Sequence, residues 1–186
     1  EVVGKKGGNF LVYKNIRNRN RISVLNNDMQ QIAKVEQDYV PDNDRMINVD
    51  FFPYSDFAYL IYQYQKKNIV YCMVSKIGGN GEKIGEVIEL DTTQVGFSAN
   101  NKIYTVLTSE DKSQIGIFKI NSKNKRMYAM TTILLNNKLE LQKKSRLPIN
   151  MDERNDYLGD FQLDNEGDLV FCKFLRGNND NINKAA

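Results

Sequence analysis

Residues 57–64 read FAYLIYQY, an aromatic and aliphatic run with almost no polar position. Aromatic and β-branched residues favour strands, and a nearly continuous apolar run is typical of a strand that is covered on both faces. A turn with proline and polar residues, at 53–56, precedes the run, and a strand-like segment with Asp50 and Phe51 precedes the turn. This stretch predicts two antiparallel strands that are joined by a tight turn.

The same order of a phenylalanine at a strand start, a turn and an apolar strand recurs along the chain. It begins at Phe51, Phe97 and Phe161. Self-similarity with a period of about 40 to 50 residues is typical of β-repeat proteins. We therefore expect repeated units, which lie at about residues 9–40, 46–92, 94–148 and 156–176.

The units are predicted to differ in their number of strands. The first reads as three short strands separated by Asn-rich turns, and the second as four strands. The interval from Phe97 to Phe161 is longer than that from Phe51 to Phe97, so the third unit, which starts with a strand at 94–97, is expected to carry an extra hairpin strand. The fourth unit is expected to end after two strands, in a polar tail.

Four-stranded meanders that repeat at this period are the pattern of β-propeller blades. Over residues 9–175 the chain resembles part of a β-propeller of the broad family of exported bacterial proteins with divergent blades, in which a turn such as residues 164–168 precedes an apolar strand. The Gly-His and Trp-Asp pairs of the tryptophan-aspartate repeat proteins are absent, since the chain has no His and no Trp.

The resemblance implies an all-β chain of three to four propeller-like blades in a single domain, residues 1–186. Propellers close with about four to eight blades, so an incomplete propeller is expected. Exposed blade edges promote aggregation, and the arc should therefore need a protein partner or the remainder of a larger propeller.

Several features bear on the compartment. The chain begins at Glu1 instead of Met, has no signal peptide, and has no stretch that approaches the roughly 20 apolar residues of a membrane span. The chain is therefore expected to be processed, truncated or part of a longer polypeptide, and a removed secretion signal is one explanation. We expect an exported protein that lies in the periplasm, lies at the outer-membrane surface or is secreted. Cys72 and Cys172 lie inside apolar runs and are predicted to be buried free thiols; a single disulfide between blades is the alternative in an oxidising compartment.

Charge gives a weak signal, because the net charge is +3 and acidic and basic residues alternate. Two stretches are more basic than the rest, Lys14 to Arg21, with Arg17 and Arg19, and Lys143, Lys144 and Arg146. A solvated hairpin loop is the favoured interpretation of these stretches, and a patch for phosphate or an acidic partner is the alternative. Nucleic-acid binding through Arg17, Arg19 and Arg21 is not expected.

The absence of His removes the commonest general base and most zinc and copper sites. A carboxylate pair is the remaining catalytic candidate: Asp50 and Asp160 each precede a repeated phenylalanine, and glycosidases need two such groups. Structural hydrogen bonding of these aspartates to a neighbouring turn is the favoured interpretation. An enzyme is therefore disfavoured, and no catalytic residue is assigned.

Two loops have compositions that are partly similar to those of ligand-binding loops. Residues 164–168 (Asp-Asn-Glu-Gly-Asp) cluster oxygen atoms around a glycine but lack the spacing of a calcium loop, and residues 78–81 are glycine-rich but lack the Lys-Ser or Lys-Thr of a phosphate loop. Both are predicted to be turns between strands, and no metal or cofactor is assigned.

Six aromatic residues are close enough in sequence to form a stacking surface, namely Tyr54, Phe57, Tyr59, Tyr62, Tyr64 and Tyr71. Alternation along the strands should divide them between two faces and bury most of them, with Tyr54 exposed. The expected function is a non-catalytic binding or scaffold module that presents loops from a propeller rim to a protein or glycan. The alternative is a carboxylate-dependent hydrolase or lyase that acts on a glycan.

Overall fold

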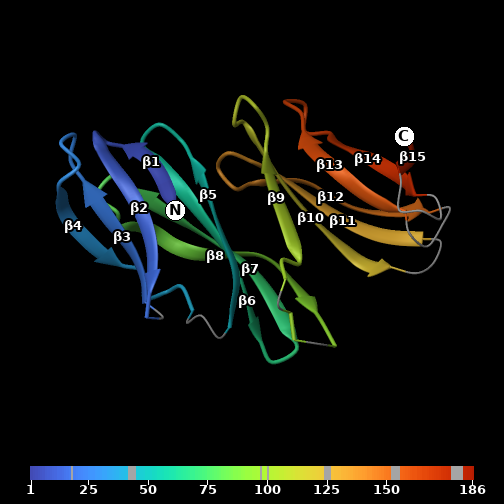
Figure 1. Ribbon diagram of the computed structural model, residues 1–186, viewed down its shortest axis with the longest axis horizontal. Helices are drawn as coiled ribbons and strands as arrows, with labels where there is room; N and C mark the ends of the chain where they lie inside the picture. Colours follow the sequence, from blue (N-terminus) through green and yellow to red (C-terminus); the bar gives the residue numbers. More distant parts are fainter. Residues whose placement is uncertain are drawn as a thin grey trace. The chain divides into compact units, whose positions relative to one another are not determined.

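All regular structure in the described part of the chain is β-strand. A computed structural model describes residues 1–17, 19–41, 45–96, 98–99, 101–123, 127–151, 156–176 and 182–186. Within these ranges the strands form four antiparallel sheets of three or four strands, and the strand order in each sheet follows the chain (Figure 1). The prediction of an all-β chain built from successive antiparallel meanders is confirmed.

The strands have the following bounds. The first sheet contains β1 (Val2–Lys6), β2 (Asn9–Ile16), β3 (Arg19–Leu25) and β4 (Gln31–Glu36). The second contains β5 (Met46–Pro53), β6 (Phe57–Lys66), β7 (Ile69–Gly78) and β8 (Lys83–Gln94). The third contains β9 (Tyr104–Thr108), β10 (Gln114–Lys123), β11 (Met127–Asn136) and β12 (Leu141–Asn150). The fourth contains β13 (Tyr157–Leu163), β14 (Leu169–Arg176) and β15 (Ile182–Ala185).

The strand content differs from the prediction at both ends of the chain. The first sheet has four strands, not three, because the short segment Val2–Lys6 pairs with β2 in spite of an irregular register beside Gly4. The last sheet has three strands, not two, because the polar segment Ile182–Ala185 pairs with β14. Both strands are short, and neither carries the regular alternation that marks a strand in sequence.

The predicted phase of the repeat is wrong in the third sheet. Gln94 ends β8, Val95 and Gly96 lie outside the strands, and Phe97 lies outside the described residues. The third sheet therefore begins at β9 and has no fifth strand among the residues that the structure describes. The predicted repeat matches the apolar run of the third unit to the second strand of the preceding unit. In the structure this run is β9, the first strand of its own sheet.

The turn between the third and fourth strand repeats better than the phenylalanines do. In the turns at residues 26–30, 78–82 and 136–140, the N–H of the first residue donates to the carbonyl of the fifth, and the N–H of the fourth donates back to the first, at 2.9–3.0 Å. The fourth residue has a positive φ in each turn, at Met29, Gly81 and Leu139. The Asn26 and Asn136 side chains each accept two backbone hydrogen bonds.

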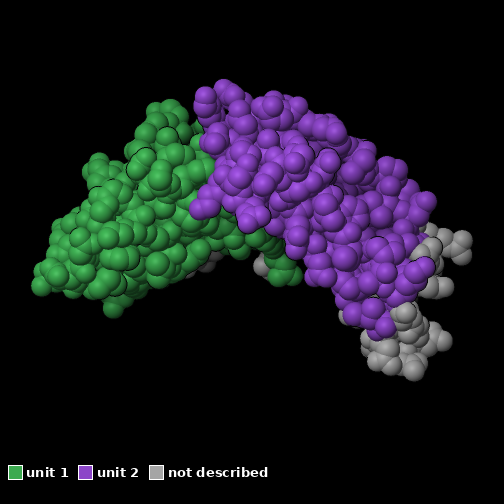
Figure 2. Space-filling view, turned by 90° about the horizontal axis from the view of Figure 1, so that it is seen from above, with its two compact units in different colours: residues 1–103 green, residues 104–186 purple. Residues whose placement is uncertain are grey.

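The chain divides into two compact units, Glu1–Ile103 (unit 1) and Tyr104–Ala186 (unit 2), which are coloured separately in Figure 2. In unit 1 the core lies between the first two sheets and includes Leu11, Ile22, Leu60 and Ile77, which are fully buried. Residues 58–63 of β6 are all buried, as the apolar run predicts.

The last strand of each four-stranded sheet is its exposed edge. Every residue of β4, β8 and β12 is exposed or half-buried, whereas the two middle strands of each sheet supply buried residues. Among the described residues, no helix has the length and apolar character needed to cross a membrane.

Candidate functional site

A groove of about 270 Å³ in unit 2 is the strongest candidate for a binding site. Its floor is one face of the third sheet and includes Phe118, Thr132 and Ser145. These three residues lie directly opposite one another, since Phe118 pairs with Thr132 and Thr132 pairs with Ser145. Directly opposed residues on antiparallel strands project from the same face, so β10, β11 and β12 together build the floor.

The wall of the groove is the turn between β13 and β14. Within this turn the Asp164 N–H donates to the Asp168 carbonyl at 3.1 Å, and the Asp164 side chain accepts from the Asp168 N–H at 2.7 Å. Residues 164–168 are therefore a hairpin turn, as predicted. No group of three or more His, Cys, Asp or Glu side chains that is arranged to hold a metal occurs in the described ranges.

Two glycines let this turn approach the floor. Gly167 has a φ of +90°, and a Cβ at this position would lie 2.6 Å from Leu134 Cδ2. A Cβ at Gly116 would lie 3.1 Å from Leu163 Cδ1. A side chain at either position would have to displace the leucine side chain that it meets, so the shape of the groove depends on both.

The lining of the groove is mostly aliphatic, with the hydroxyl side chains of Thr132 and Ser145 in its floor. Leu134, Leu147, Leu163 and Leu169 line it, and Lys143 and Asp168 are the ionisable residues in its lining. Aliphatic walls of this kind suit the burial of aliphatic groups, and a few polar groups can orient a ligand. Lys143, Ser145 and Leu147 occupy alternate positions of an exposed strand, and this spacing is the sequence feature that marks the surface.

Asp50 and Asp160 have different surroundings. The Asp50 carboxylate pairs with the Lys102 ammonium at 2.7 Å and accepts a hydrogen bond from the Asn48 amide at 2.7 Å. Asp160 lies at an irregular point of β13, is exposed, and has a φ of 52°. Asp50 belongs to unit 1 and Asp160 to unit 2.

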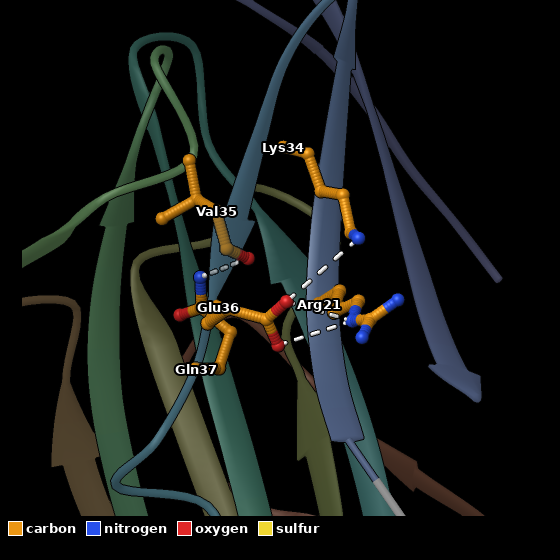
Figure 3. A network of polar contacts seen from close by, with 5 residues as sticks. All are labelled: Arg21, Lys34, Val35, Glu36 and Gln37. Carbon is orange, nitrogen blue, oxygen red and sulfur yellow. Dashed lines mark hydrogen bonds and ion pairs between the residues drawn. The ribbon is translucent and has the colours of Figure 1, made fainter. Parts of the chain in front are cut away.

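The basic residues lie mainly on strands and not in loops. Arg17 is in the turn between β2 and β3, but Arg19 and Arg21 belong to β3. The Arg21 guanidinium pairs with Glu36 at 2.8 Å, and Lys34 approaches the same carboxylate at 3.9 Å (Figure 3). This ion pair neutralises part of the predicted patch.

The second basic stretch, Lys143, Lys144 and Arg146, lies on the exposed strand β12 and not in a hairpin loop. Its residues are solvent-exposed, as expected, but the backbone is that of an edge strand. Charged side chains on an edge strand oppose pairing with other chains.

The aromatic residues of the second sheet are divided between two faces, as predicted. Tyr59 and Tyr62 are buried, and Tyr64 stacks on Tyr71 with ring centres 5.0 Å apart. The expectation that Tyr54 is exposed is wrong. Its ring stacks on Phe57 at 4.8 Å, and its hydroxyl is buried with no hydrogen-bond partner among the described residues, so that burial raises the pKa of Tyr54 to about 12.

Both cysteines are free thiols, as predicted. Cys72 is buried as predicted, but Cys172 is half-buried, so the prediction that it is buried is wrong.

No family model matches the chain, and no curated protein or solved structure matches it either. The interpretation of the groove therefore depends on its own geometry.

Proposed function

We propose that the chain is a non-catalytic binding module, made of propeller-like blades, and that the groove in unit 2 holds part of a protein partner. Consecutive four-stranded meanders with buried middle strands and an exposed last strand are what a blade requires, which supports the propeller interpretation. Export and the need for a partner or further blades are parts of the same proposal.

The apolar character of the groove carries the proposal. Four leucines line it, so its main gain on binding is the burial of aliphatic surface, at about 25 cal/mol per Å². Glycans are usually held by exposed aromatic rings, but Phe118, the aromatic residue of the lining, is only 5% exposed. A protein segment with aliphatic side chains fits this surface better than a sugar does.

The alternative of a carboxylate-dependent hydrolase has less support. A general acid or nucleophile needs a carboxylate that is available to the substrate. The Asp50 carboxylate is held by Lys102 and Asn48, which favours a structural role for it. The groove itself has one carboxylate, that of Asp168, in its lining.

The proposal is tested by nuclear magnetic resonance of leucine methyl groups. Unlabelled peptides of alternating valine and threonine, and cello-oligosaccharides as the competing class, are titrated into the labelled protein. We expect the peptides to shift the Leu134 and Leu163 methyl signals and the sugars to leave them unchanged.

Two variants on the same exposed strand provide the control. Leu147→Lys places a charge in the groove, whereas Leu141→Lys places the same charge on β12 outside its lining; the wild-type side chains are 44% and 61% exposed. Peptide binding should be lost in Leu147→Lys and kept in Leu141→Lys. Equal binding by the two variants, or no shift with any peptide, would contradict the proposal.

A further inference from the structure

The turn between β7 and β8 contains an asparagine that is followed by a glycine, Asn80 and Gly81, and the sequence has no other such pair. Asparagine is one of the less durable residues of proteins. The backbone nitrogen of the next residue can attack its side chain, and a glycine in that place has no side chain to hinder the attack. Asn80 is exposed to water, whereas Gly81 is buried. The two reacting groups therefore lie on either side of the protein surface.

The reaction needs water and no other partner. The Gly81 nitrogen gives up its proton to water and forms a bond to Asn80 Cγ, the bond from Cγ to Nδ2 breaks, and the amide nitrogen leaves as ammonia. Water then opens the resulting cyclic imide at one of its two carbonyls. Opening at one carbonyl gives aspartate. Opening at the other gives isoaspartate, in which the main chain runs through the side-chain carbons and is longer by a methylene.

The first sheet of unit 1 holds the backbone on both sides of Asn80. The Asn9 amide donates to the Gly79 carbonyl at 3.5 Å, and the Gln37 amide donates to the Gly81 carbonyl at 3.0 Å. The second of these hydrogen bonds is buried. The peptide groups around Asn80 are therefore fixed by residues of another sheet, although the Asn80 side chain itself is exposed.

Hydrogen bonds inside the turn also engage both reacting groups. The Gly81 N–H, which would have to lose its proton, donates to the Gly78 carbonyl at 3.0 Å. The Asn80 side chain accepts from the Glu82 N–H at 3.1 Å and donates to the Glu82 carboxylate at 2.8 Å. Attack on Asn80 Cγ needs a rotation of the peptide group that joins residues 80 and 81. Such a rotation would break the bond to Gly78 and move Gly81 away from its neighbours.

The space around Gly81 leaves no room for a longer main chain. A Cβ at Gly81 would lie 3.0 Å from Val24, 3.1 Å from Ile22 and 3.3 Å from Val35, in each case from a Cγ2 methyl group. These side chains are β-branched and have little rotational freedom. The isoaspartate product carries an additional methylene beside Gly81, so the turn cannot return to its original position against β3 and β4.

We propose that Asn80 is a site of spontaneous deamidation that is protected while the turn at residues 78–82 lies against the first sheet, and that isoaspartate formation there releases the turn irreversibly. The reaction proceeds when this turn opens locally, because local opening needs less free energy than unfolding of the whole chain. The released turn no longer joins the first two sheets of unit 1. This inference is independent of the proposed function, since the groove lies in unit 2.

The first experiment compares the rate of deamidation at Asn80 in the folded chain and in the same chain unfolded in urea, at one mildly alkaline pH. Trypsin cleaves after Lys76 and Lys83 and releases residues 77–83 as one peptide, in which mass spectrometry measures the conversion of the amide to the acid. We expect the folded chain to react at least about fiftyfold more slowly than the unfolded chain. Equal rates would overturn the protection.

The second experiment tests whether local opening controls the rate. Gln37→Met removes the hydrogen bond to the Gly81 carbonyl. Tyr13→Phe is the control, because it removes a buried hydrogen bond of the same unit, to Asn20 at 2.6 Å, and leaves those of the turn in place. We expect Gln37→Met to raise the deamidation rate of the folded chain about threefold to tenfold, and Tyr13→Phe to raise it less than about twofold. An equal rise in both variants would mean that global unfolding exposes Asn80, and would overturn local opening.

The third experiment tests the release of the turn. The isoaspartate form is separated from the aged protein and compared with Asn80→Asp by urea denaturation. Both forms carry an additional carboxylate near Glu82, but only the isoaspartate form has the longer main chain. We expect the isoaspartate form to unfold at a lower urea concentration than Asn80→Asp. Equal midpoints would show that the turn accepts the additional methylene, and the proposed release would be wrong.

Discussion

Each unit places a turn glycine against the face of a neighbouring sheet, but the two contacts differ in what surrounds them. In unit 1, a Cβ at Gly81 would lie 3.0 Å from Val24 Cγ2 and 3.1 Å from Ile22 Cγ2, and both of those residues are buried. In unit 2, a Cβ at Gly167 would meet Leu134, a half-buried residue that borders the groove. The first contact is filled with rigid side chains, and the second leaves space for a ligand.

The polar contacts at the two turns differ in the same way. In unit 1 the Gln37 amide donates to the Gly81 carbonyl at 3.0 Å, and the Tyr39 hydroxyl donates to the Gln37 side chain at 2.6 Å while it accepts from Ser75. In unit 2 the backbone N–H of Asp111 donates to the Asn165 side chain at 3.2 Å in an exposed position. A buried network fixes the turn of unit 1, whereas solvent competes with the contact in unit 2.

The largest effect is expected for Gly81→Ala. Its φ of +81° strains any other residue, and the new methyl group has only β-branched side chains around it. Strain and overpacking together should lower the free energy of unfolding by about 3 kcal/mol. Gly85→Ala is the matched control, because Gly85 has a similar φ of +72° and no atom within 4 Å of the Cβ position, so only about 1 kcal/mol is expected. Urea denaturation measures the free energy of unfolding of both variants. Equal losses would mean that the side chains packed around Gly81 add nothing to the cost of backbone strain.

Gly167→Ala should have an intermediate effect. Its φ of +90° imposes the same kind of strain, but the Leu134 side chain can rotate into the groove. We expect a loss of about 1.5 kcal/mol, mostly from strain. The rotated leucine would fill the groove, so peptide binding should fall more than stability does. If Gly167→Ala is as destabilising as Gly81→Ala, the groove has no room for the displaced Leu134 side chain.

The sequence predicts the strands better than it predicts the sheets to which they belong. The run at residues 57–64 is recognisable because its burial on both faces excludes polar residues, and the structure confirms it. Phe51 and Phe161 both lie on first strands, yet the strand boundary near Phe97 was misplaced, because an apolar run has the same appearance in a first strand as in a second one. The turn residues Asn26 and Asn136 mark the repeat more reliably, since their side chains satisfy specific backbone N–H groups.

The groove was less predictable than the fold. Its leucines come from four strands and resemble ordinary core residues in sequence. What distinguishes them is the close approach of the turn at Gly167, and a contact between segments so far apart in the chain leaves no local pattern. Asp50 is different, because the sequence favours a structural role for its carboxylate, although its partner Lys102 is far along the chain.

Tyr39→Phe should have the smallest effect of the three and tests the buried network of unit 1. The substitution removes one hydrogen bond to Gln37 and one from Ser75, and should cost about 1 kcal/mol at neutral pH. Burial raises the pKa of Tyr39 to about 12, from an ordinary value of 10.0. Below pH 10 the hydroxyl is neutral in both the folded and the unfolded chain, so its contribution is fully present there. Between pH 10 and 12 the unfolded chain loses this proton first, and stability falls as the pH rises.

The phenylalanine variant lacks that proton, so the difference in unfolding free energy between the wild type and Tyr39→Phe should shrink as the pH is raised from 9 to 11. Urea denaturation at pH 7, 9, 10 and 11 measures this difference, and Ser75→Ala, which keeps the titrating hydroxyl, provides the control. A difference that stays constant up to pH 11 would mean that water reaches Tyr39 in the folded chain. The turn contact of unit 1 would then be as open to solvent as that of unit 2, and the contrast between them would rest on the packing around Gly81 alone.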